Sequence, residues 1–496
     1  MKKPIHFYFL AVLVSFSVFD LGIHLSSLLF LSIAGLVVLI AKRREVLIPP
    51  VAFVVVAYVL AFPAPALLPD LYPGLWTKVS PHALEYGMLW AVRGFGAFAL
   101  GYVLVEQFGL RLKNRGSRGE TLSKERASYT IYMLTSIGWL AMLAWVASVM
   151  LFGISLSFIE GDPGGIDRGE ETLVQIFTLL SSLRYSFLLG FLILYYWKKT
   201  NQHLFYLLVG LMIALFIEVI IAGSKGWIIR GIVVGLLALA FLPVRINLKQ
   251  TTIGVLALVA IYGSFAVITE YRSVMQNEMQ SGRNVFDFTV QLESFGAALV
   301  GSLPFTESAK NRQTEVDHTD VLSRFGSGIL SFANLLDMTG RQSLYENAWK
   351  SFLIPVYSIT PRALVPDKPI FFGSGRYAQE YYGWNYGGIS VTLLGSLYYA
   401  WGYVGIIFGM AFFGGVLAYV VKQVKMIEGY SLHWLTLLTI LLLPMLDVGA
   451  TFDAIINNFI RVAVLLWLLH LLYPWVRGSR RRSIANRSQI EYGNRS

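Results

Sequence analysis

The sequence predicts an all-α protein that crosses a membrane about twelve times and carries one large external loop. Three observations lead to this fold class. The chain is 56% apolar and only 14% charged, which lies outside the range of soluble globular proteins. Apolar runs of about 20 residues, the length that spans the hydrocarbon core of a bilayer, recur along it. Cations gather between alternate runs, as the positive-inside rule requires of cytoplasmic loops.

Twelve apolar runs are predicted to be spans. In chain order they are 5–19, 22–41, 48–68, 83–105, 129–157, 173–197, 204–222, 227–243, 251–269, 393–421, 432–450 and 455–475. The first is short, and with Met1, Lys2 and Lys3 before it this segment resembles a secretory signal. No small-x-small cleavage site follows, so we expect a retained span.

The orientation of the spans follows from their flanking charges. Lys and Arg concentrate in pieces such as the 107–128 loop and the C-terminal tail, whereas the short loops on the other side hold only Lys78, Arg168 and Lys225. This places both termini in the cytoplasm, and we expect a multi-pass protein of the cytoplasmic (inner) membrane. The predicted domains are a nine-span membrane domain (1–269), an external, periplasmic loop (270–392), a three-span membrane domain (393–476) and a basic cytoplasmic tail (477–496).

The external loop is unusually cationic for a segment outside the membrane. Its cations are Arg272, Arg283, Lys310, Arg312, Arg324, Arg341, Lys350, Arg362, Lys368 and Arg376. Long loops can be translocated regardless of charge. A cationic segment against the outer bilayer surface predicts an anionic ligand, and a lipid-linked phosphate is the natural candidate. Within the loop, 286–305 and 344–358 are apolar or amphipathic, so we expect short helices on the outer membrane face.

Two short motifs lie on the same, external side of the membrane as this loop. Glu270-Tyr271-Arg272 lies where the ninth span leaves the bilayer. The carboxylate of Glu270 and the guanidinium of Arg272 can form an ordinary salt bridge. If an acceptor sugar binds here, Glu270 can instead act as a general base. The turn from Gly223 to Gly226, which contains Lys225 and precedes Arg230, can seat an anion on backbone N–H groups. A simple connector between two spans explains that turn equally well.

The segment from Thr360 to Tyr386 combines prolines, cations and aromatic residues. Prolines stiffen the chain around Arg362 and Lys368. This reduces the conformational entropy lost when these cations and Arg376 bind a ligand. Flat rings follow, and they are platforms for sugars or members of an interfacial aromatic belt. These aromatic residues are Tyr377, Tyr381, Tyr382, Trp384 and Tyr386.

Charges inside the predicted spans gather toward the external side. They are Glu218, Lys225 and Arg230 around spans seven and eight, and Asp447, Asp453 and Arg461 around spans eleven and twelve. Arg93 and Arg184 lie deeper. Such residues either pair with one another to fix helix packing or line a cavity, and the set as a whole favours a cavity that opens to the outside.

Several functional classes are disfavoured. The chain has no cysteine, so thiolate chemistry and Cys metal sites are excluded. Its seven histidines lack metal-ligand spacing, and His318 is the single histidine in the external loop and a candidate acid or base. No nucleotide-binding glycine fingerprint occurs in a cytoplasmic loop. The net charge of +11 is explained by the positive-inside rule, so we expect no nucleic-acid partner.

In its topology and around Arg362, the chain resembles the O-antigen polymerase (Wzy-type) family, whose members join oligosaccharide repeat units in the membrane. The topology carries the resemblance across nearly the whole chain. Locally, Arg362 is followed after ten residues by Gly373, which matches an Arg-x10-Gly pattern of some members. A second copy is missing, because Lys225 has Leu236 at the glycine position.

The resemblance implies a GT-C-like, metal-independent glycosyltransferase without a cofactor that polymerises polyprenyl-pyrophosphate-linked repeat units into surface polysaccharide. Glu270, Arg272 and Arg362 are then the expected catalytic residues. Residues expected to bind pyrophosphate or sugar are Lys225, Arg230, Arg283, Arg341, Lys368, Arg376, Tyr377 and Tyr381. The implied partners are lipid-linked oligosaccharide, membrane lipids, a chain-length regulator and a flippase.

Three alternatives stay open. An O-antigen ligase shares the topology and would be favoured by an essential His318. A transporter or flippase of lipid-linked oligosaccharide is supported by the deep Arg93 and Arg184. A non-catalytic membrane scaffold explains the spans but gives no reason for the clustering of Arg, Tyr and Gly in the external loop.

Overall fold

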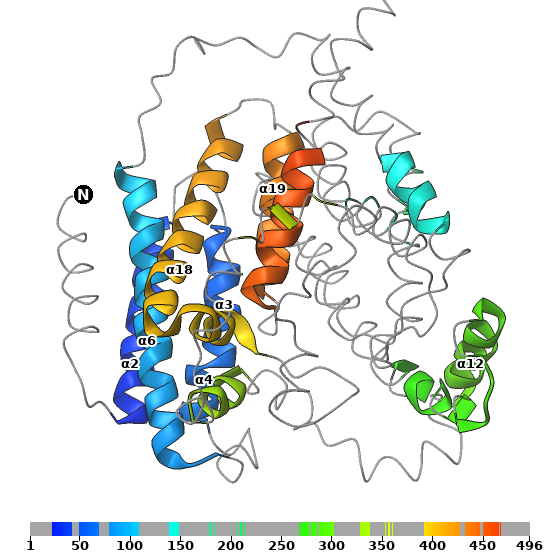
Figure 1. The fold of residues 1–496 in the computed structure, drawn as a ribbon, viewed down its shortest axis with the longest axis horizontal. Helices are drawn as coiled ribbons and strands as arrows, with labels where there is room; N and C mark the ends of the chain where they lie inside the picture. Colours follow the sequence, from blue (N-terminus) through cyan, green and yellow to red (C-terminus); the bar gives the residue numbers. More distant parts are fainter. Residues whose placement is uncertain are drawn as a thin grey trace, which may run out of the picture.

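The structure is a computed structural model of the 496-residue chain. It describes residues 22–41, 49–68, 79–108, 138–147, 287–301, 328–337, 391–426, 432–446 and 450–465, most of 267–284, and scattered positions elsewhere. Every regular element among these residues is a helix (Figure 1). Three of the helices are long and apolar enough to cross a membrane. The described part therefore confirms the all-helical fold class and is consistent in length and composition with membrane spans, while the count of twelve spans stays a prediction.

Two of the predicted spans appear as continuous helices. Helix α2 covers Ile23–Ala41 and corresponds to the run at 22–41. Helix α6 covers Pro81–Phe108 and is longer at both ends than the run at 83–105. Its start follows from local chemistry: Ser80 Oγ accepts the N–H of Ala83 at 3.2 Å, and proline at the first helical position has no N–H to leave unsatisfied.

The predicted span at 48–68 is broken in the structure. Helix α3 (Val51–Ala61) ends at Phe62, whose N–H still donates to the carbonyl of Tyr58 at 3.0 Å, and α4 (Pro63–Leu67) begins directly afterwards. The break occurs before Pro63 because proline lacks the N–H that would continue the α3 ladder and its ring clashes with the preceding turn. The prediction of one span over 48–68 is therefore wrong in treating the segment around Pro63 as continuous helix.

Helix α18 (Thr392–Met426) is 35 residues long and has a break inside it. A straight helix of that length would extend about 50 Å, far more than the hydrocarbon core needs. The backbone turns at Trp401 and Gly402, where Gly402 has φ 63° and ψ −152°, a conformation essentially restricted to glycine. Figure 1 shows the first part of α18 lying across the bundle above α4 and the second part rising beside α6.

The second part of α18 packs closely along α6. A Cβ atom added at Gly101 would meet the backbone of Ala411, and one added at Gly414 would meet the backbone of Phe98. Small residues let membrane helices approach to backbone contact in this way. Over the whole contact, the pairings advance in the same direction along both helices, from Tyr86 with Tyr403 to Val105 with Gly415. The two helices are therefore parallel.

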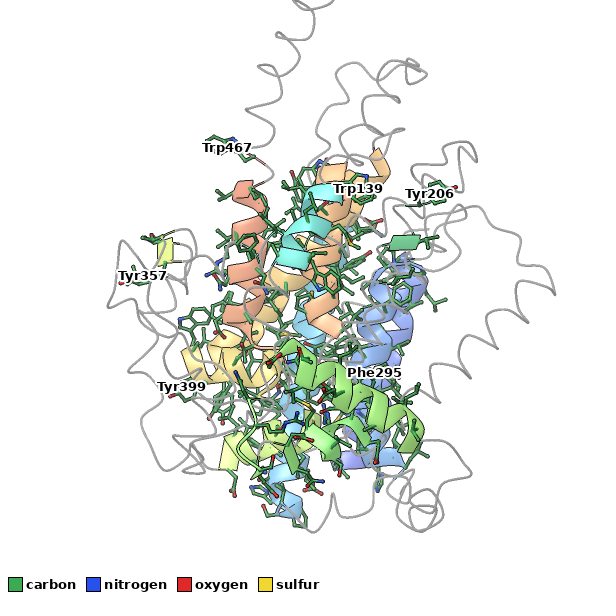
Figure 2. The ribbon with its side chains drawn as sticks, turned by 90° about the vertical axis from the view of Figure 1, so that its right-hand side faces the viewer. Trp139, Tyr206, Phe295, Tyr357, Tyr399 and Trp467 are labelled. Carbon is green, nitrogen blue, oxygen red and sulfur yellow. The ribbon has the colours of Figure 1, made fainter. Side chains whose placement is uncertain are left out.

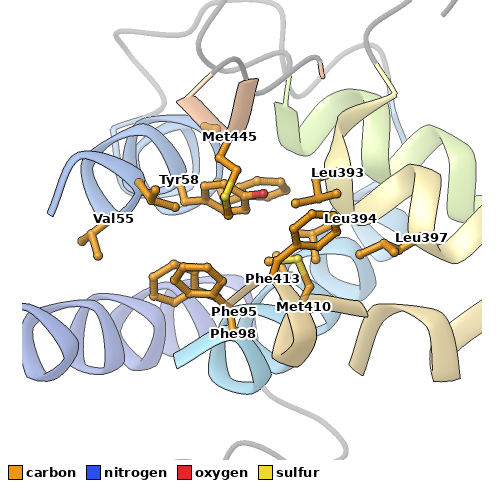
Figure 3. Packing of buried hydrophobic residues seen from close by; sticks show 14 of the residues in the cluster. Val55, Tyr58, Phe95, Phe98, Leu393, Leu394, Leu397, Met410, Phe413 and Met445 are labelled. Carbon is orange, nitrogen blue, oxygen red and sulfur yellow. The ribbon is translucent and has the colours of Figure 1, made fainter. Parts of the chain in front are cut away.

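The core between these helices is aromatic and aliphatic. The Phe30 ring of α2 stacks on Phe95 of α6 with centroids 4.4 Å apart, and Tyr58 of α3 lies 5.9 Å from the same ring. Figure 3 shows α3, α6, both parts of α18, and α19 (Leu432–Leu446) contributing side chains to this core. Buried apolar packing of this kind fixes the helices relative to one another.

One buried helix inside the 270–392 segment was not predicted. Residues Gly328–Asp337 form an apolar helix, and its Phe332 ring lies edge-on to Phe62 at 6.3 Å. Its Ala333 contacts Gly87 of α6, and Leu335 contacts Gly395 of α18. The spacing of buried Ile329, Phe332, Ala333 and Leu336 is that of a helix face. This piece of the loop is therefore part of the bundle.

A last described helix, 452–465, starts against the first part of α18. The N–H of Phe452 donates to Ser396 Oγ at 2.8 Å in a buried position, and the Phe452 ring lies 4.8 Å from Trp401. The predicted spans at 432–450 and 455–475 thus appear as α19, which contains Pro444, and as a helix that begins at 452. Both lie in contact with α18 or with its break.

Candidate functional site

The first candidate site is a helical hairpin formed by residues 267–301. Its first helix ends in the sequence Ser281-Gly282-Arg283. Gly282 has φ +81°, and the N–H of Arg283 donates to the carbonyl of Glu278 at 3.2 Å. A glycine in the left-handed conformation followed by this backbone bond is the usual way to end a helix. The chain can therefore reverse direction within a few residues.

The second helix, α12 (Phe288–Gly301), begins just after the turn. Asp287 Oδ1 accepts the N–H of Thr289 at 2.8 Å, so Asp287 is the N-cap residue. The helix lies within the segment 286–305, where a short helix was predicted. Figure 2 shows α12 in green, with Phe295 labelled.

The two helices of the hairpin pack antiparallel. The Tyr271 ring lies 6.5 Å from the Phe295 ring. Near the open end, a Cβ atom at Gly301 would lie 3.0 Å from Glu270 Oε1. The face of α12 turned to this interface is buried and partly polar, and its residues are Val290, Gln291, Ser294 and Ala298. Glu270 therefore lies at the base of the hairpin, where Gly301 leaves room for its carboxyl group.

Glu270 and Arg272 differ in their surroundings. Glu270 is 9% exposed, and Arg272 is half-buried. Residues two apart on a helix point to different faces, so the two side chains leave the helix in different directions. Between them, Tyr271 is fully buried, and its burial raises the pKa of the phenol above the ordinary value. Tyr271 therefore stays neutral and serves packing, so Glu270 and Arg272 are the two neighbours left as candidates for binding or chemistry.

Arg283 lies at the opposite end of the hairpin, in the turn. Its guanidinium forms ion pairs with Glu278 at 3.2 Å and with Glu293 at 3.3 Å, and its side chain is 51% exposed. The hydrogen bond from Arg283 to Glu278 raises the pKa of the guanidinium. Two carboxylates thus surround the cation that was expected to bind substrate.

The remaining predicted site residues lie outside the described part of the chain. They are Lys225, Arg230, Arg341, Arg362, Lys368, Arg376, Tyr377 and Tyr381. The same holds for Arg184, Glu218, His318, Tyr382, Trp384, Tyr386 and Asp447. Of the predicted catalytic and binding residues, the structure places Glu270 and Arg272 on different faces of one helix at the base of the hairpin and Arg283 at the other end.

A second group of polar residues lies between α6 and the break of α18. Arg93 is only 7% exposed, and its Cζ lies 4.7 Å from the centre of the Trp90 ring. That ring stacks on Tyr403 at 4.0 Å, and the Tyr86 hydroxyl donates to the Tyr403 hydroxyl at 2.9 Å. A cation over an aromatic face is stabilised where water is scarce.

The position of Arg93 inside a predicted span indicated a cation within the membrane, but its aromatic neighbours were not predicted. The signal was present, because Tyr86, Trp90 and Arg93 recur at helical spacings of four and three and so share one face of α6. Tyr403 follows Gly402, whose conformation sets the direction of the second part of α18. Figure 1 shows that this group, on α6 and α18, lies on the other side of the molecule from α12.

The charges of the last described helix occupy a third position. Asp453 lies in the first turn of 452–465, where a carboxylate interacts favourably with the helix dipole. Its Oδ1 is buried and has no hydrogen-bond partner among the residues that the structure describes. Arg461 follows two turns later, and burial is partial for both residues. In the described ranges, no three His, Asp or Glu side chains gather closely enough to hold a metal ion.

Comparison with known proteins adds no family to this description. No protein-family model, no curated protein and no solved structure matches the chain.

Proposed function

We propose that the protein polymerises polyprenyl-pyrophosphate-linked oligosaccharide repeat units into surface polysaccharide on the external face of the cytoplasmic membrane. One observation carries the proposal. A helical hairpin presents Glu270 and Arg272 at its base, directly after the apolar run at 251–269 that is predicted to be the ninth span. A carboxylate and a guanidinium at the membrane boundary are the groups that such a transfer needs.

The chemistry is a glycosyl transfer between two lipid-linked sugars. The bond between the anomeric carbon of the growing glycan and its pyrophosphate breaks, and the electron pair leaves with the pyrophosphate oxygen. A hydroxyl oxygen of the acceptor sugar forms the new bond to that carbon. Glu270 takes the hydroxyl proton as general base. No oxidation or reduction occurs, and the acceptor retains its own lipid pyrophosphate.

The cations stabilise the leaving group. Arg272 and Arg362 neutralise the charge that accumulates on the departing pyrophosphate, and in a partly dehydrated site each such contact is strong. Further binding residues are Lys225, Arg230, Arg341, Lys368 and Arg376 for phosphate, and Tyr377 and Tyr381 for sugar rings. Arg283 contributes least, because Glu278 and Glu293 already neutralise its charge.

The direct test supplies purified protein in liposomes with lipid-linked repeat units and follows product length on a gel. The wild-type protein is expected to produce a ladder of lengthened glycans. Arg272→Ala is expected to reduce the rate by about 10²-fold or more, as does loss of a donor that stabilises a transition-state oxyanion.

The matched control is Arg283→Ala at the tip of the same hairpin, which should retain the ladder. Equal activity of wild type and Arg272→Ala, with both proteins at normal levels, would contradict the assignment of Arg272. No ladder from the wild type would contradict the proposed reaction. Transfer of a finished glycan to a lipid A core, dependent on His318, would identify a ligase instead.

A transporter or flippase is the second candidate, and one observation favours it. Arg93 is buried within the bundle beside a helix that is broken at Gly402, and broken helices next to intramembrane charge form substrate sites in many transporters. Movement of a fluorescent lipid-linked sugar across protein-containing vesicles, lost in Arg93→Ala and kept in Arg272→Ala, would favour this function over polymerisation.

A further inference from the structure

We propose that the base of the 267–301 hairpin is anchored in the surface of the lipid bilayer through the exposed apolar end of α12. The anchoring residues are Ala297, Leu299 and Val300. The hairpin would then stand upright, with its turn in water and its open end among lipid chains and headgroups. This inference concerns a membrane-docking surface and holds whichever reaction the protein performs.

The exposed side chains of α12 change character along the helix. In its first half the exposed residues are Thr289, Leu292 and Glu293, two of which are polar. In its last part residues 296, 297, 299 and 300 are all exposed, and none of them is polar. Leu299 is 49% exposed and Val300 61% exposed. Two large aliphatic side chains next to each other at one end of a helix mark a contact surface when the other end is charged.

The charged side chains described in the hairpin concentrate at its turn. Arg283, Glu278 and Glu293 form their ion pairs at the turn, and Asp287 caps α12 beside them. The described charges at the open end are Glu270, which is buried, and Arg272, which is half-buried. Charged side chains strongly prefer water to hydrocarbon, so the turn is the end that faces water.

The hairpin is continuous in sequence with the predicted ninth span. The chain enters the hairpin from the apolar run at 251–269, so Glu270 lies at the membrane boundary. Because the helices are antiparallel, Gly301 returns to the level of Glu270, as their contact shows. Leu299 and Val300 directly precede Gly301 and therefore lie at the same boundary. The bilayer is thus the apolar partner that the geometry provides.

This placement has a consequence for the ligand. Amphipathic helices dock with their apolar side chains at the boundary between headgroups and acyl chains. If Leu299 and Val300 occupy that boundary, Arg272 lies at the level of lipid phosphates. A lipid-linked anion would then meet the guanidinium without leaving the membrane.

The test places a fluorescent label at single cysteines in the full-length protein, which has no cysteine of its own. The variants are Ala297→Cys, Leu299→Cys and Val300→Cys. The matched control is Thr289→Cys, which is exposed on the same helix and ten residues away from Leu299, or about 15 Å. Each labelled protein is reconstituted into vesicles at a low protein-to-lipid ratio. Quenching is measured with a nitroxide-bearing lipid and with aqueous iodide.

Labels at 297, 299 and 300 are expected to be quenched severalfold more by the nitroxide lipid than the label at 289, and less by iodide. Equal iodide quenching at all four positions would overturn the proposal. Protection that disappears when the protein is diluted in lipid would also overturn it, since a second copy of the chain would then be the partner. All four side chains are exposed, so the variants should melt at the wild-type temperature. The readout requires no sugar substrate, so it fails or succeeds independently of the polymerase assay.

Discussion

Individual glycines decide the backbone geometry of this protein at two positions. Gly402 has φ 63° and ψ −152° and divides α18, whereas Gly282 has φ +81° and ends the first helix of the hairpin. Neither conformation is readily available to residues with a Cβ atom. Gly402 is one of several glycines in the apolar run at 393–421, and the sequence does not reveal which of them serves close packing and which a break.

Gly402→Ala should therefore destabilise the protein. The added Cβ atom forces a conformation that costs roughly 1–3 kcal/mol, so the melting temperature of the purified protein in detergent should fall. Gly35→Ala in α2 is the matched control. That glycine is helical, and a Cβ atom added there would have no neighbouring atom within 4 Å, so the melting temperature should stay the same or rise. A fall for both variants would show that the break at Gly402 is not the cause.

Glu270 is the residue whose assigned role is most open to a direct kinetic test. Glu270→Gln keeps the shape of the side chain beside Gly301 but removes its ability to accept a proton. The initial rate of glycan lengthening should fall by roughly 10²-fold or more, the contribution typical of a positioned general base. Glu293→Gln at the hairpin tip should leave the rate unchanged. Loss of protein rather than of rate in Glu270→Gln would instead indicate a packing role.

At the scale of elements, the contact between α6 and α18 organises the described bundle. Its closest points are Gly101 against Ala411 and Gly414 against Phe98. Apolar length and composition predicted both helices, but not their partnership, because two spans separated by nearly 300 residues leave no local sequence signal of contact. The helix at 328–337 was not predicted, because it is shorter than a span and lies in the cationic segment 270–392 that was assigned to an external loop.

Two adjacent glycines provide a test of this contact. Gly414→Ala would press a Cβ atom into the backbone of Phe98, whereas Gly415→Ala would place one 3.4 Å from a methyl group of Val105. We expect Gly414→Ala to lose roughly 1–3 kcal/mol of stability, as overpacking does, and Gly415→Ala to be close to neutral. Thermal unfolding of the two purified variants in the same detergent checks this. Equal stability would mean that the helices are further apart than described.

At the scale of the whole molecule, sequence alone predicted a helical membrane protein. Every regular element in the described ranges is a helix, and three of these helices are apolar and long enough to cross a membrane. The sequence also indicated that Glu270 and Arg272 lie at the end of a span, because the apolar run at 251–269 ends there and charged residues begin. The packing around them was beyond such reasoning. The room that Gly301 provides for Glu270 depends on a neighbouring helix, and so does the neutralisation of Arg283 by Glu293. Burial and pairing arise only when separate segments meet.

The central claim is that the hairpin with Glu270 and Arg272 faces the outside of the cell membrane, where lipid-linked glycans are joined. Labelling of single cysteines by a membrane-impermeant maleimide in intact cells tests it most directly. Asn284→Cys, exposed at the hairpin tip, should react before the cells are permeabilised. Lys113→Cys, in the predicted cytoplasmic loop 107–128, should react only afterwards. The opposite pattern would place the hairpin in the cytoplasm and contradict the proposed function.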